Sequence, residues 1–419
     1  MGRPRLRILF VSPYPPSRRS GAPVRLRGLM AALARSHAIS LLTFLPAADR
    51  ARALDPILAS CDEVVTVPND RVGLSGAARR VLQVRAALGA RSYDGLALER
   101  RSFQTALDQM AQRSRYDVIQ VESCFMSGYA FPADSAIVLD EHNVEYEIRH
   151  RTVAIARSPL RKLHDYVDYL ALKSEEQRAW RAVDACAVTS SRDEDAVRAA
   201  FPAARTAVVP NAVDTQFFAP RGVRPDPRTL LFFGALGYYP NVEAVLFLVH
   251  EVMPLLRRMD RSLRLVIVGA SPPPEVQRCA GSDVIITGEV EDVRPYLERA
   301  HVVVAPIRIG GGTRLKILEA MAMAKPIVST TLGAEGIAAA DQRELLLADT
   351  AGAFAAQVDR LLNDDDLAAS LGSAARRLVE TSYDWSASAR NLEALYGSAL
   401  TAQADRAGSR AARALPNIG

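Results

Sequence analysis

Residues 302–320 read VVVAPIRIGGGTRLKILEA. The stretch opens with a β-branched apolar run, Val302–Ile307, which predicts a strand covered on both faces. Three consecutive glycines, Gly310, Gly311 and Gly312, follow it and let the backbone approach an anion closely. A strand, a glycine-rich turn and a helix in this order are typical of an α/β domain that binds a phosphate-bearing ligand.

The pattern predicts a helix after the glycines, and four polar residues lie at its start or within its first two turns. Thr313 is placed to cap it, and Arg314 and Lys316 lie in its first turn, where positive charge opposes the helix dipole. An anionic ligand would offset these cations. Glu319 lies about two turns further on, where its carboxylate can accept two hydrogen bonds from a ribose diol. The alternative is a glycine-rich turn before an ordinary surface helix.

The same alternation of apolar runs and helical patterns extends along the whole chain. Two βαβ series separated by a proline-rich break predict two doubly wound, Rossmann-like α/β domains. Between the first two strands of the second series, apolar residues at helical spacing predict one amphipathic helix that Asn241 caps. The predicted strands are Arg7–Ser12, Ile39–Phe44, Glu63–Val67, Asp117–Val121, Ala136–Asp140 and Ala185–Thr189, then Thr229–Gly234, Leu263–Val268, Val284–Thr287, Val302–Ile307 and Pro326–Thr330.

The break begins at Val209 and sets the predicted domain limits. We expect an N-terminal domain over residues 1–215 and a C-terminal domain over 216–384. A last helix is expected over 385–402. The tail, residues 403–419, is rich in Ala, Arg and Gly and is expected to be disordered.

Length and composition narrow the class of protein. The chain has 419 residues, 49% hydrophobic and 24% charged, which suits two globular domains of roughly 100–200 residues each. The net charge of +5 is too small to indicate nucleic-acid binding. No apolar stretch is long enough to cross a bilayer, and the N-terminus lacks the features of a signal peptide. Four scattered cysteines fit a reducing compartment, so we expect a cytoplasmic protein.

The positive charge gathers in two stretches, residues 72–115 and 149–162. Solvated helix faces would account for them. The alternative is a patch that contacts anionic lipid headgroups or a pyrophosphate-bearing acceptor, and thus a peripheral contact with the inner membrane surface.

Ligands of open parallel sheets bind at the carboxyl ends of the strands, which directs attention to two further loops. The loop after the first strand ends in Gly21 and opens a helix, whose N-terminal amides suit a phosphate, although a flexible turn explains one glycine equally well. This loop lacks G-x-G-x-x-G, which argues against a dinucleotide oxidoreductase. His142 follows another strand and either binds a sugar hydroxyl or has a structural role.

At these residues the sequence resembles family 4 of the glycosyltransferases, the retaining enzymes of GT-B fold, and within it a bacterial branch often found in polysaccharide assembly. The resemblance covers nearly the whole chain. Besides the opening RILFVSPYPPSRRSG, the segments that carry it are Gly310–Gly336, Asp140–Glu147, Val208–Phe218, Phe232–Val245, Thr287–Val293 and Tyr383–Trp385.

The resemblance implies that the N-terminal domain binds the acceptor and the C-terminal domain binds the nucleotide sugar. It also implies a role for several residues. Glu319 matches the second glutamate of the family's Glu-x7-Glu signature, which holds the nucleotide ribose. Gly21 matches the loop whose amide faces the donor phosphate, and His142 resembles the histidine that contacts the transferred sugar. Glu289 and Val290 resemble the segment beside the nucleobase. The last helix resembles the one that crosses back to the N-terminal domain.

Two positions depart from the family pattern. The first glutamate of the signature, which grips the donor sugar, is replaced by Gly311. The family's diphosphate-binding Arg and Lys follow the first strand of the C-terminal domain, but residues 234–241 of this chain contain no cation. Our hypothesis is that Arg314 and Lys316 supply that charge from the other loop, together with the amides of Gly310–Gly312.

These features predict a hexosyl-type glycosyltransferase that uses a nucleotide-sugar donor and a saccharide or lipid-linked saccharide acceptor, with retention of configuration. Because the candidate loops at the strand ends contain no Asp-x-Asp motif, we expect no metal and no other cofactor, with protein charge stabilising the leaving diphosphate. Two alternatives stay open: an inactive binding protein that keeps the fold, which Gly311 and Ala235 would suit, and a nucleotide-sugar epimerase.

Overall fold

A computed structural model describes residues 4–18, 21–46, 55–155, 159–260, 262–310 and 312–414. The chain forms two compact units. The first unit combines Met1–Pro210 with Ser388–Gly419, and the second unit is Asn211–Ala387. The division after Pro210 lies five residues before the boundary that the sequence indicated, because the proline-rich connection itself belongs to the second unit.

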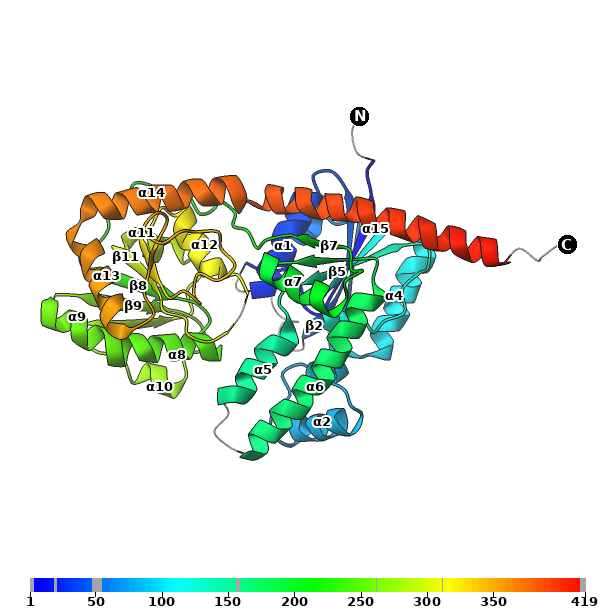
Figure 1. Ribbon diagram of the computed structural model, residues 1–419, viewed down its shortest axis with the longest axis horizontal. Helices are drawn as coiled ribbons and strands as arrows, with labels where there is room; N and C mark the ends of the chain where they lie inside the picture. The colour runs from blue at the N-terminus through cyan, green and yellow to red at the C-terminus, as the bar shows by residue number, and fades with distance from the viewer. Residues whose placement is uncertain are drawn as a thin grey trace. The chain divides into compact units, whose positions relative to one another are not determined.

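The first unit is built on a parallel sheet of seven strands in the order β3-β2-β1-β4-β5-β6-β7 (Figure 1). Its central strands are buried along their whole length, as the unbroken apolar runs predicted. The strands are β1 (Arg7–Ser12), β2 (Ala38–Pro46), β3 (Glu63–Asn69), β4 (Val118–Glu122), β5 (Ala136–Glu141), β6 (Ala185–Val188) and β7 (Thr206–Val208).

Helices of the first unit connect consecutive strands, and α2, α5 and α6 extend away from the sheet (Figure 1). We call these three helices the lobe. The helices are α1 (Gly21–Leu33), α2 (Gly76–Leu88), α3 (Tyr93–Leu98), α4 (Arg101–Arg113), α5 (Glu145–Ile155), α6 (Pro159–Ala182) and α7 (Ser191–Ala200), with short 3-10 turns at Pro56–Ser60 and Cys124–Met126.

The second unit has a parallel sheet of six strands in the order β10-β9-β8-β11-β12-β13. Its strands are β8 (Thr229–Phe233), β9 (Arg264–Val268), β10 (Val284–Gly288), β11 (Val302–Ala305), β12 (Ile327–Ser329) and β13 (Leu346–Leu347). Its helices are α8 (Tyr239–Phe247), α9 (Met253–Met259), α10 (Pro274–Gln277), α11 (Arg294–Arg299), α12 (Leu315–Ala322), α13 (Ala351–Asn363) and α14 (Asp365–Ser382). Both sheets are doubly wound, which confirms the predicted fold class.

Some local expectations were wrong. The predicted amphipathic helix is α8, a π-helical turn at Leu248–Val252 and α9 in succession. It begins at Tyr239, so Asn241 lies inside α8 instead of capping it. The short strands β7 and β13 had no recognisable signal, since two or three residues cannot establish a pattern.

The last helix, α15 (Trp385–Ala414), extends beyond the range that the sequence indicated. The segment expected to be disordered after Ala402 is helical as far as Ala414, which its alanine content favours. From Ser388 onward α15 belongs to the first unit and contributes core residues to it. Leu392, Leu395 and Tyr396 are each at most 3% exposed.

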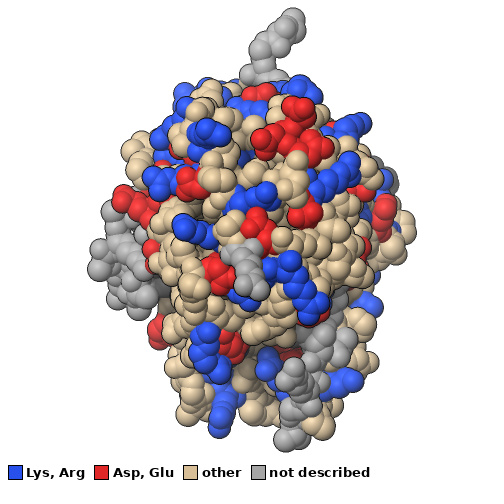
Figure 2. Space-filling model, turned by 90° about the vertical axis from the view of Figure 1, so that its left-hand side faces the viewer, with Lys and Arg blue, Asp and Glu red and all other residues tan. Residues whose placement is uncertain are grey.

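Within the described ranges, no helix combines the length and the hydropathy that a membrane crossing requires. Figure 2 shows one face of the molecule, on which basic and acidic side chains are interspersed. This face does not carry the continuous basic surface typical of nucleic-acid-binding proteins.

Candidate functional site

The second unit changes its winding direction between β8 and β11. These two strands are neighbours in the sheet, although β9 and β10 lie between them in the sequence. The connections that leave β8 and β11 therefore diverge to opposite sides, which opens a crevice at their carboxyl ends where ligands of doubly wound folds bind. The Gly310–Gly312 loop follows β11, and residues 234–238 follow β8.

Lys316 lies near the start of α12 and reaches back to the end of β8. Its Nζ donates a hydrogen bond of 2.7 Å to Oδ1 of Asn241 and lies 4.4 Å from the ring centroid of Phe232. The Asn241 amide in turn donates to the carbonyl of Ala235 at 2.8 Å. The ammonium group is therefore at the end of β8, where residues 234–241 supply no cation of their own.

Gly234 makes this position of Lys316 possible. Its φ is +147°, and a Cβ built on it would lie 2.7 Å from Nζ of Lys316. Any side chain at residue 234 would displace the amine. The glycine that ends β8 and the lysine of α12, more than eighty residues apart, are thus parts of one arrangement.

The glycine loop is shaped by its backbone. Gly310 and Gly312 have φ values of +114° and +75°, which residues with a side chain rarely adopt. Gly311 lies outside the described residues. Arg314, whose Nη1 donates to the Gly312 carbonyl at 2.6 Å, is the N-cap of α12. The expectation that Thr313 caps this helix was wrong, since its hydroxyl donates to the carbonyl of Gly336 at 3.4 Å.

Two ionisable groups on α12 have pKa values near neutrality. Burial, and then the neighbouring Arg314, lower the pKa of Lys316 to about 7. Burial raises the pKa of Glu319 to about 7, although Lys316 opposes this shift. No carboxylate among the described residues lies within ion-pair distance of Lys316. An incoming anion would therefore restore the charge of a lysine that the protein leaves only partly protonated.

Glu289 and Val290 follow β10, an edge strand of the second unit. Glu289 is exposed, and Val290 packs against the core with part of its side chain accessible. Both lie at the carboxyl end of the sheet. The structure thus brings Lys316, Arg314 and Glu319 close together and places Glu289 and Val290 two strands away from β8.

The first unit has a similar switch point between β1 and β4. Gly21 is the first residue of α1, with φ +54°, and a Cβ on it would meet no atom within 4 Å. Tyr14 lies in the loop between β1 and α1, and its hydroxyl is 2.9 Å from Nδ1 of His142. The loops after β1 and β5 therefore meet through this pair.

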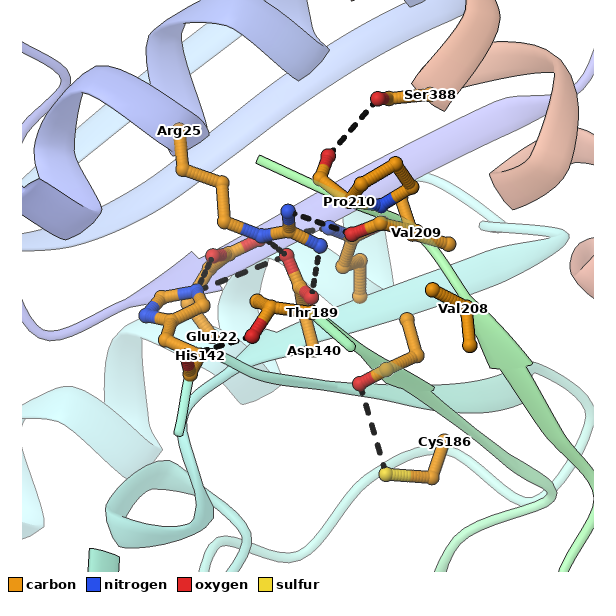
Figure 3. A network of polar contacts seen from close by, with 12 residues as sticks. Arg25, Glu122, Asp140, His142, Cys186, Thr189, Val208, Val209, Pro210 and Ser388 are labelled. Carbon is orange, nitrogen blue, oxygen red and sulfur yellow. Dashed lines mark hydrogen bonds and ion pairs between the residues drawn. The ribbon is translucent and has the colours of Figure 1, made fainter. Parts of the chain in front are cut away.

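Two carboxylates lie against one ring nitrogen of His142, on the side away from Tyr14's partner Nδ1 (Figure 3). Its Nε2 is 2.8 Å from Oε2 of Glu122, at the end of β4, and 3.6 Å from Oδ2 of Asp140. The carboxylate of Asp140 is bound by Arg25, whose Nε and Nη2 donate to its two oxygens at 2.9 and 2.7 Å. We call Tyr14, Arg25, Glu122, Asp140 and His142 the histidine cluster.

The cluster keeps His142 protonated. Burial opposes the charged ring, but Asp140 and Glu122 raise the pKa of His142 to about 9. Burial also opposes ionisation of Asp140, yet Arg25 and His142 hold the pKa of Asp140 below its ordinary value. Burial and the charge of Asp140 raise the pKa of Glu122. Two carboxylates face one imidazolium and one guanidinium, so the cluster neutralises its own charge.

Two groups of described residues bring three potential metal ligands within 4.8 Å of one another. The first is Glu122, Asp140 and His142, where the guanidinium of Arg25 already occupies the Asp140 carboxylate. The second is Cys124, Glu141 and Glu176. There the oxygens of Glu176 accept the backbone N–H groups of residues 145 and 146 at the start of α5.

Sequence reasoning missed several of these residues. Glu122 and Asp140 lie at strand ends, where a systematic search of strand termini would have found them. Asn241 was noted only as a helix cap. Tyr14 and Arg25 carried no signal, because their partners come from strands more than a hundred residues away.

Part of the second unit matches a known family of proteins. Residues 227–364 match the family model described as Glycosyl transferases group 1. The D-inositol 3-phosphate glycosyltransferase of Corynebacterium efficiens is 27% identical over 263 residues, which cover 58% of this chain. The match spans only 59% of that relative's own length.

Solved structures share the fold over nearly the whole chain. Sucrose-phosphate synthase from Thermosynechococcus elongatus gives a TM-score of 0.69 at 18% identity, over 95% of this chain and 100% of that one. HepE from Anabaena, in complex with UDP and glucose, gives 0.63 at 15% identity, over 93% and 98%. The two-domain architecture is that of the GT-B glycosyltransferases. Residues 227–364 are thus similar in sequence to the group 1 glycosyl transferases, and the chain shares the fold of these solved structures.

Proposed function

We propose that this chain transfers a hexosyl-type sugar from a nucleoside-diphosphate donor to a saccharide or lipid-linked saccharide, with retention and without a metal. The observation that carries the proposal is the position of Lys316 at the switch point of the second unit, against Gly234 and Asn241. Lys316 has no carboxylate partner within the described residues, and it lies where doubly wound folds bind phosphates.

In this proposal the groups around the Gly310–Gly312 loop act on the leaving diphosphate. Negative charge grows on its oxygens as the bond to the anomeric carbon breaks, so cations fixed in advance lower the barrier. Lys316 and Arg314 supply the cations, and the glycine amides donate hydrogen bonds. Glu319 accepts hydrogen bonds from the ribose diol. Because this charge replaces a divalent ion, chelation with EDTA leaves the turnover unchanged.

A thermal-shift screen of UDP-, GDP- and ADP-sugars tests the donor site. A nucleotide sugar that binds raises the melting temperature by mass action. We expect Glu319→Ala to remove most of the shift, because the ribose loses its acceptor, and Arg314→Ala to reduce it. Arg360→Gln, at an exposed position of α13, is the matched control and keeps the wild-type shift. Equal shifts in all four proteins would contradict the assignment of the site.

The lobe of the first unit supports an acceptor or membrane contact. Arginines from both basic stretches of the sequence meet around one pocket of 550 Å³ between α2, α5 and α6. Arg149 is paired with Asp94 and Asp168, whereas Arg79 and Arg80 line the pocket near its surface. The same helices expose large apolar side chains: Val81, Val84 and Leu88 on α2, and Leu163, Tyr166 and Leu170 on α6. Together these features suit a cytoplasmic enzyme with peripheral contact to an anionic bilayer.

Sedimentation with vesicles tests this contact. We expect the wild type to bind vesicles that contain phosphatidylglycerol and not those of phosphatidylcholine alone. Arg80→Glu with Lys162→Glu should weaken binding roughly tenfold or more, at about 1 kcal/mol for each basic residue near the surface. The control pair, Arg258→Glu with Arg360→Glu, changes the net charge equally in the second unit. If both pairs weaken binding alike, net charge is the cause and the lobe is not the contact.

A further inference from the structure

The last residues of the first stretch of the first unit are held by side-chain hydrogen bonds, one of which comes from the histidine cluster (Figure 3). Three consecutive carbonyls end the first segment of the first unit, and each accepts a side-chain hydrogen bond. Asn391 donates to the carbonyl of Val208 at 3.1 Å, and Ser388 donates to that of Pro210 at 2.8 Å. Arg25 donates from Nη1 to the carbonyl between them, that of Val209, at 2.8 Å.

Arg25 is the only one of these three donors that also belongs to the cluster. Its guanidinium uses one edge for the two oxygens of Asp140 and its remaining nitrogen for Val209. This planar, three-point arrangement is specific to arginine, since the ammonium group of a lysine cannot match a carboxylate in the same bidentate way. At 1% exposure, Arg25 is buried with its partners.

The orientation of the Asp140 carboxylate determines which oxygen atoms contact the ring of His142. With both oxygens held by Arg25, Oδ2 stays 3.6 Å from Nε2 of His142, and Glu122 takes the direct hydrogen bond at 2.8 Å. Without the two hydrogen bonds from Arg25, the Asp140 carboxylate would turn towards the imidazolium of His142 and compete with Glu122 for the hydrogen bond from Nε2. The ring would then leave the position in which Nδ1 meets Tyr14 at 2.9 Å.

We propose that Arg25 is a positioning residue for His142. It holds Asp140 in a fixed orientation, anchored to the backbone carbonyl of Val209, and through Asp140 it positions the imidazole ring. The inference rests on the proposed function, to which it adds the role that the resemblance implies for His142, contact with the transferred sugar. Arg25 touches no reacting group and acts through the carboxylate that it holds.

The first test measures the pH titration of the His142 ring from the chemical shifts of its ¹⁵N resonances in the full chain. Comparison with His142→Gln assigns these resonances. The charged or titratable groups that face the ring are Tyr14, Glu122 and Asp140, with Arg25 behind Asp140 and Glu145 nearby on α5. Arg25→Gln removes a cation and releases Asp140, so the midpoint should rise. Asp140→Asn removes a carboxylate, so the midpoint should fall.

The second test is turnover, measured as nucleoside diphosphate released when water accepts the sugar, with whichever of UDP-glucose, GDP-mannose or ADP-glucose gives the largest thermal shift as the donor. We expect Arg25→Gln to lower kcat at least tenfold with KM within twofold, and Arg25→Lys to recover part of the loss. The control is Arg27→Gln, which removes another α1 arginine from an ion pair, that with Asp55 at 3.0 Å, and should match the wild type in both tests.

Two results would overturn the proposal. One is an unchanged His142 titration in folded Arg25→Gln and Arg25→Lys proteins. The other is a loss of kcat in Arg27→Gln as large as in Arg25→Gln, which would indicate a general effect of disturbing α1. The proposed function fails separately, since the thermal shift by nucleotide sugars depends on the second unit and should persist in every Arg25 variant.

Discussion

The two switch points of this protein have the same topology and opposite electrostatics. In the first unit, the histidine cluster pairs two carboxylates with Arg25 and His142, and the shared charge raises the pKa of His142 to about 9. In the second unit, Lys316 lies beside Arg314 without a carboxylate within ion-pair distance among the described residues, and its pKa is lowered to about 7. The first site neutralises its own charge. The second is the one that an anionic donor completes in the proposed function.

The largest expected effect comes from a substitution within the histidine cluster. Asp140→Ala leaves Arg25 and His142 buried without their shared carboxylate, which should cost about 3–5 kcal/mol of the free energy of unfolding. Trp180, buried in the first unit, reports this unfolding in a Trp385→Phe background by fluorescence during urea titration. Asp55→Ala, at the partly exposed pair with Arg27, is the control and should cost about 1 kcal/mol. Equal losses would mean that the cluster has no special role in stability.

Lys316→Met tests the switch point of the second unit. Because the folded protein holds this lysine with a lowered pKa, removing its charge should leave the unliganded protein as stable as the wild type or about 1 kcal/mol more stable. Nucleotide-sugar binding should weaken by about 1.5–3 kcal/mol, the usual range for a charged hydrogen bond. Calorimetry and thermal melting measure the two quantities on the same sample. If Lys316→Met were less stable than the wild type and bound the nucleotide sugar equally well, the contrast drawn between the two switch points would be wrong.

The smallest effect is the dependence of donor binding on pH. Above pH 7 Lys316 is increasingly neutral, so binding a diphosphate takes up a proton and the affinity should fall by up to tenfold, or about 1.4 kcal/mol, per pH unit. Below pH 7 protonation of Glu319 removes the acceptor for the ribose diol, and the affinity falls again. Lys316→Met should abolish the alkaline fall and Glu319→Gln the acidic one, as titration calorimetry across pH 5.5–9 would show. A flat profile in the wild type would exclude both groups from the site.

The fold was largely predictable from sequence because buried parallel strands are marked by unbroken apolar runs. Arg7–Ser12 and β1 coincide, and the other predicted strands differ from the observed ones by one or two residues at an end. The Gly310–Gly312 loop and Glu319 were recognisable because glycines, cations and a carboxylate occur together after such a run. The wrong caps, Thr313 and Asn241, depended on where each helix actually begins, which backbone angles decide and composition does not.

Contacts between distant loops could not be predicted in the same way. Lys316 meets Asn241 because β8 and β11 are neighbours. Arg25 of α1 meets the carbonyl of Val209, which follows β7. A doubly wound topology predicts the first adjacency but not the direction of a flexible side chain. Arginine on the buried side of an apolar helix gives no hint of its partner until that partner is known.

The first unit is assembled from two stretches of chain, with the whole second unit inserted between them. On the ribosome, residues up to Pro210 emerge without the Leu392, Leu395 and Tyr396 that cover their core. At about 5–20 residues per second, the missing helix follows roughly 10–40 seconds later. During that interval the nascent sheet exposes apolar surface, which makes this half of the protein a substrate for chaperones before synthesis is complete.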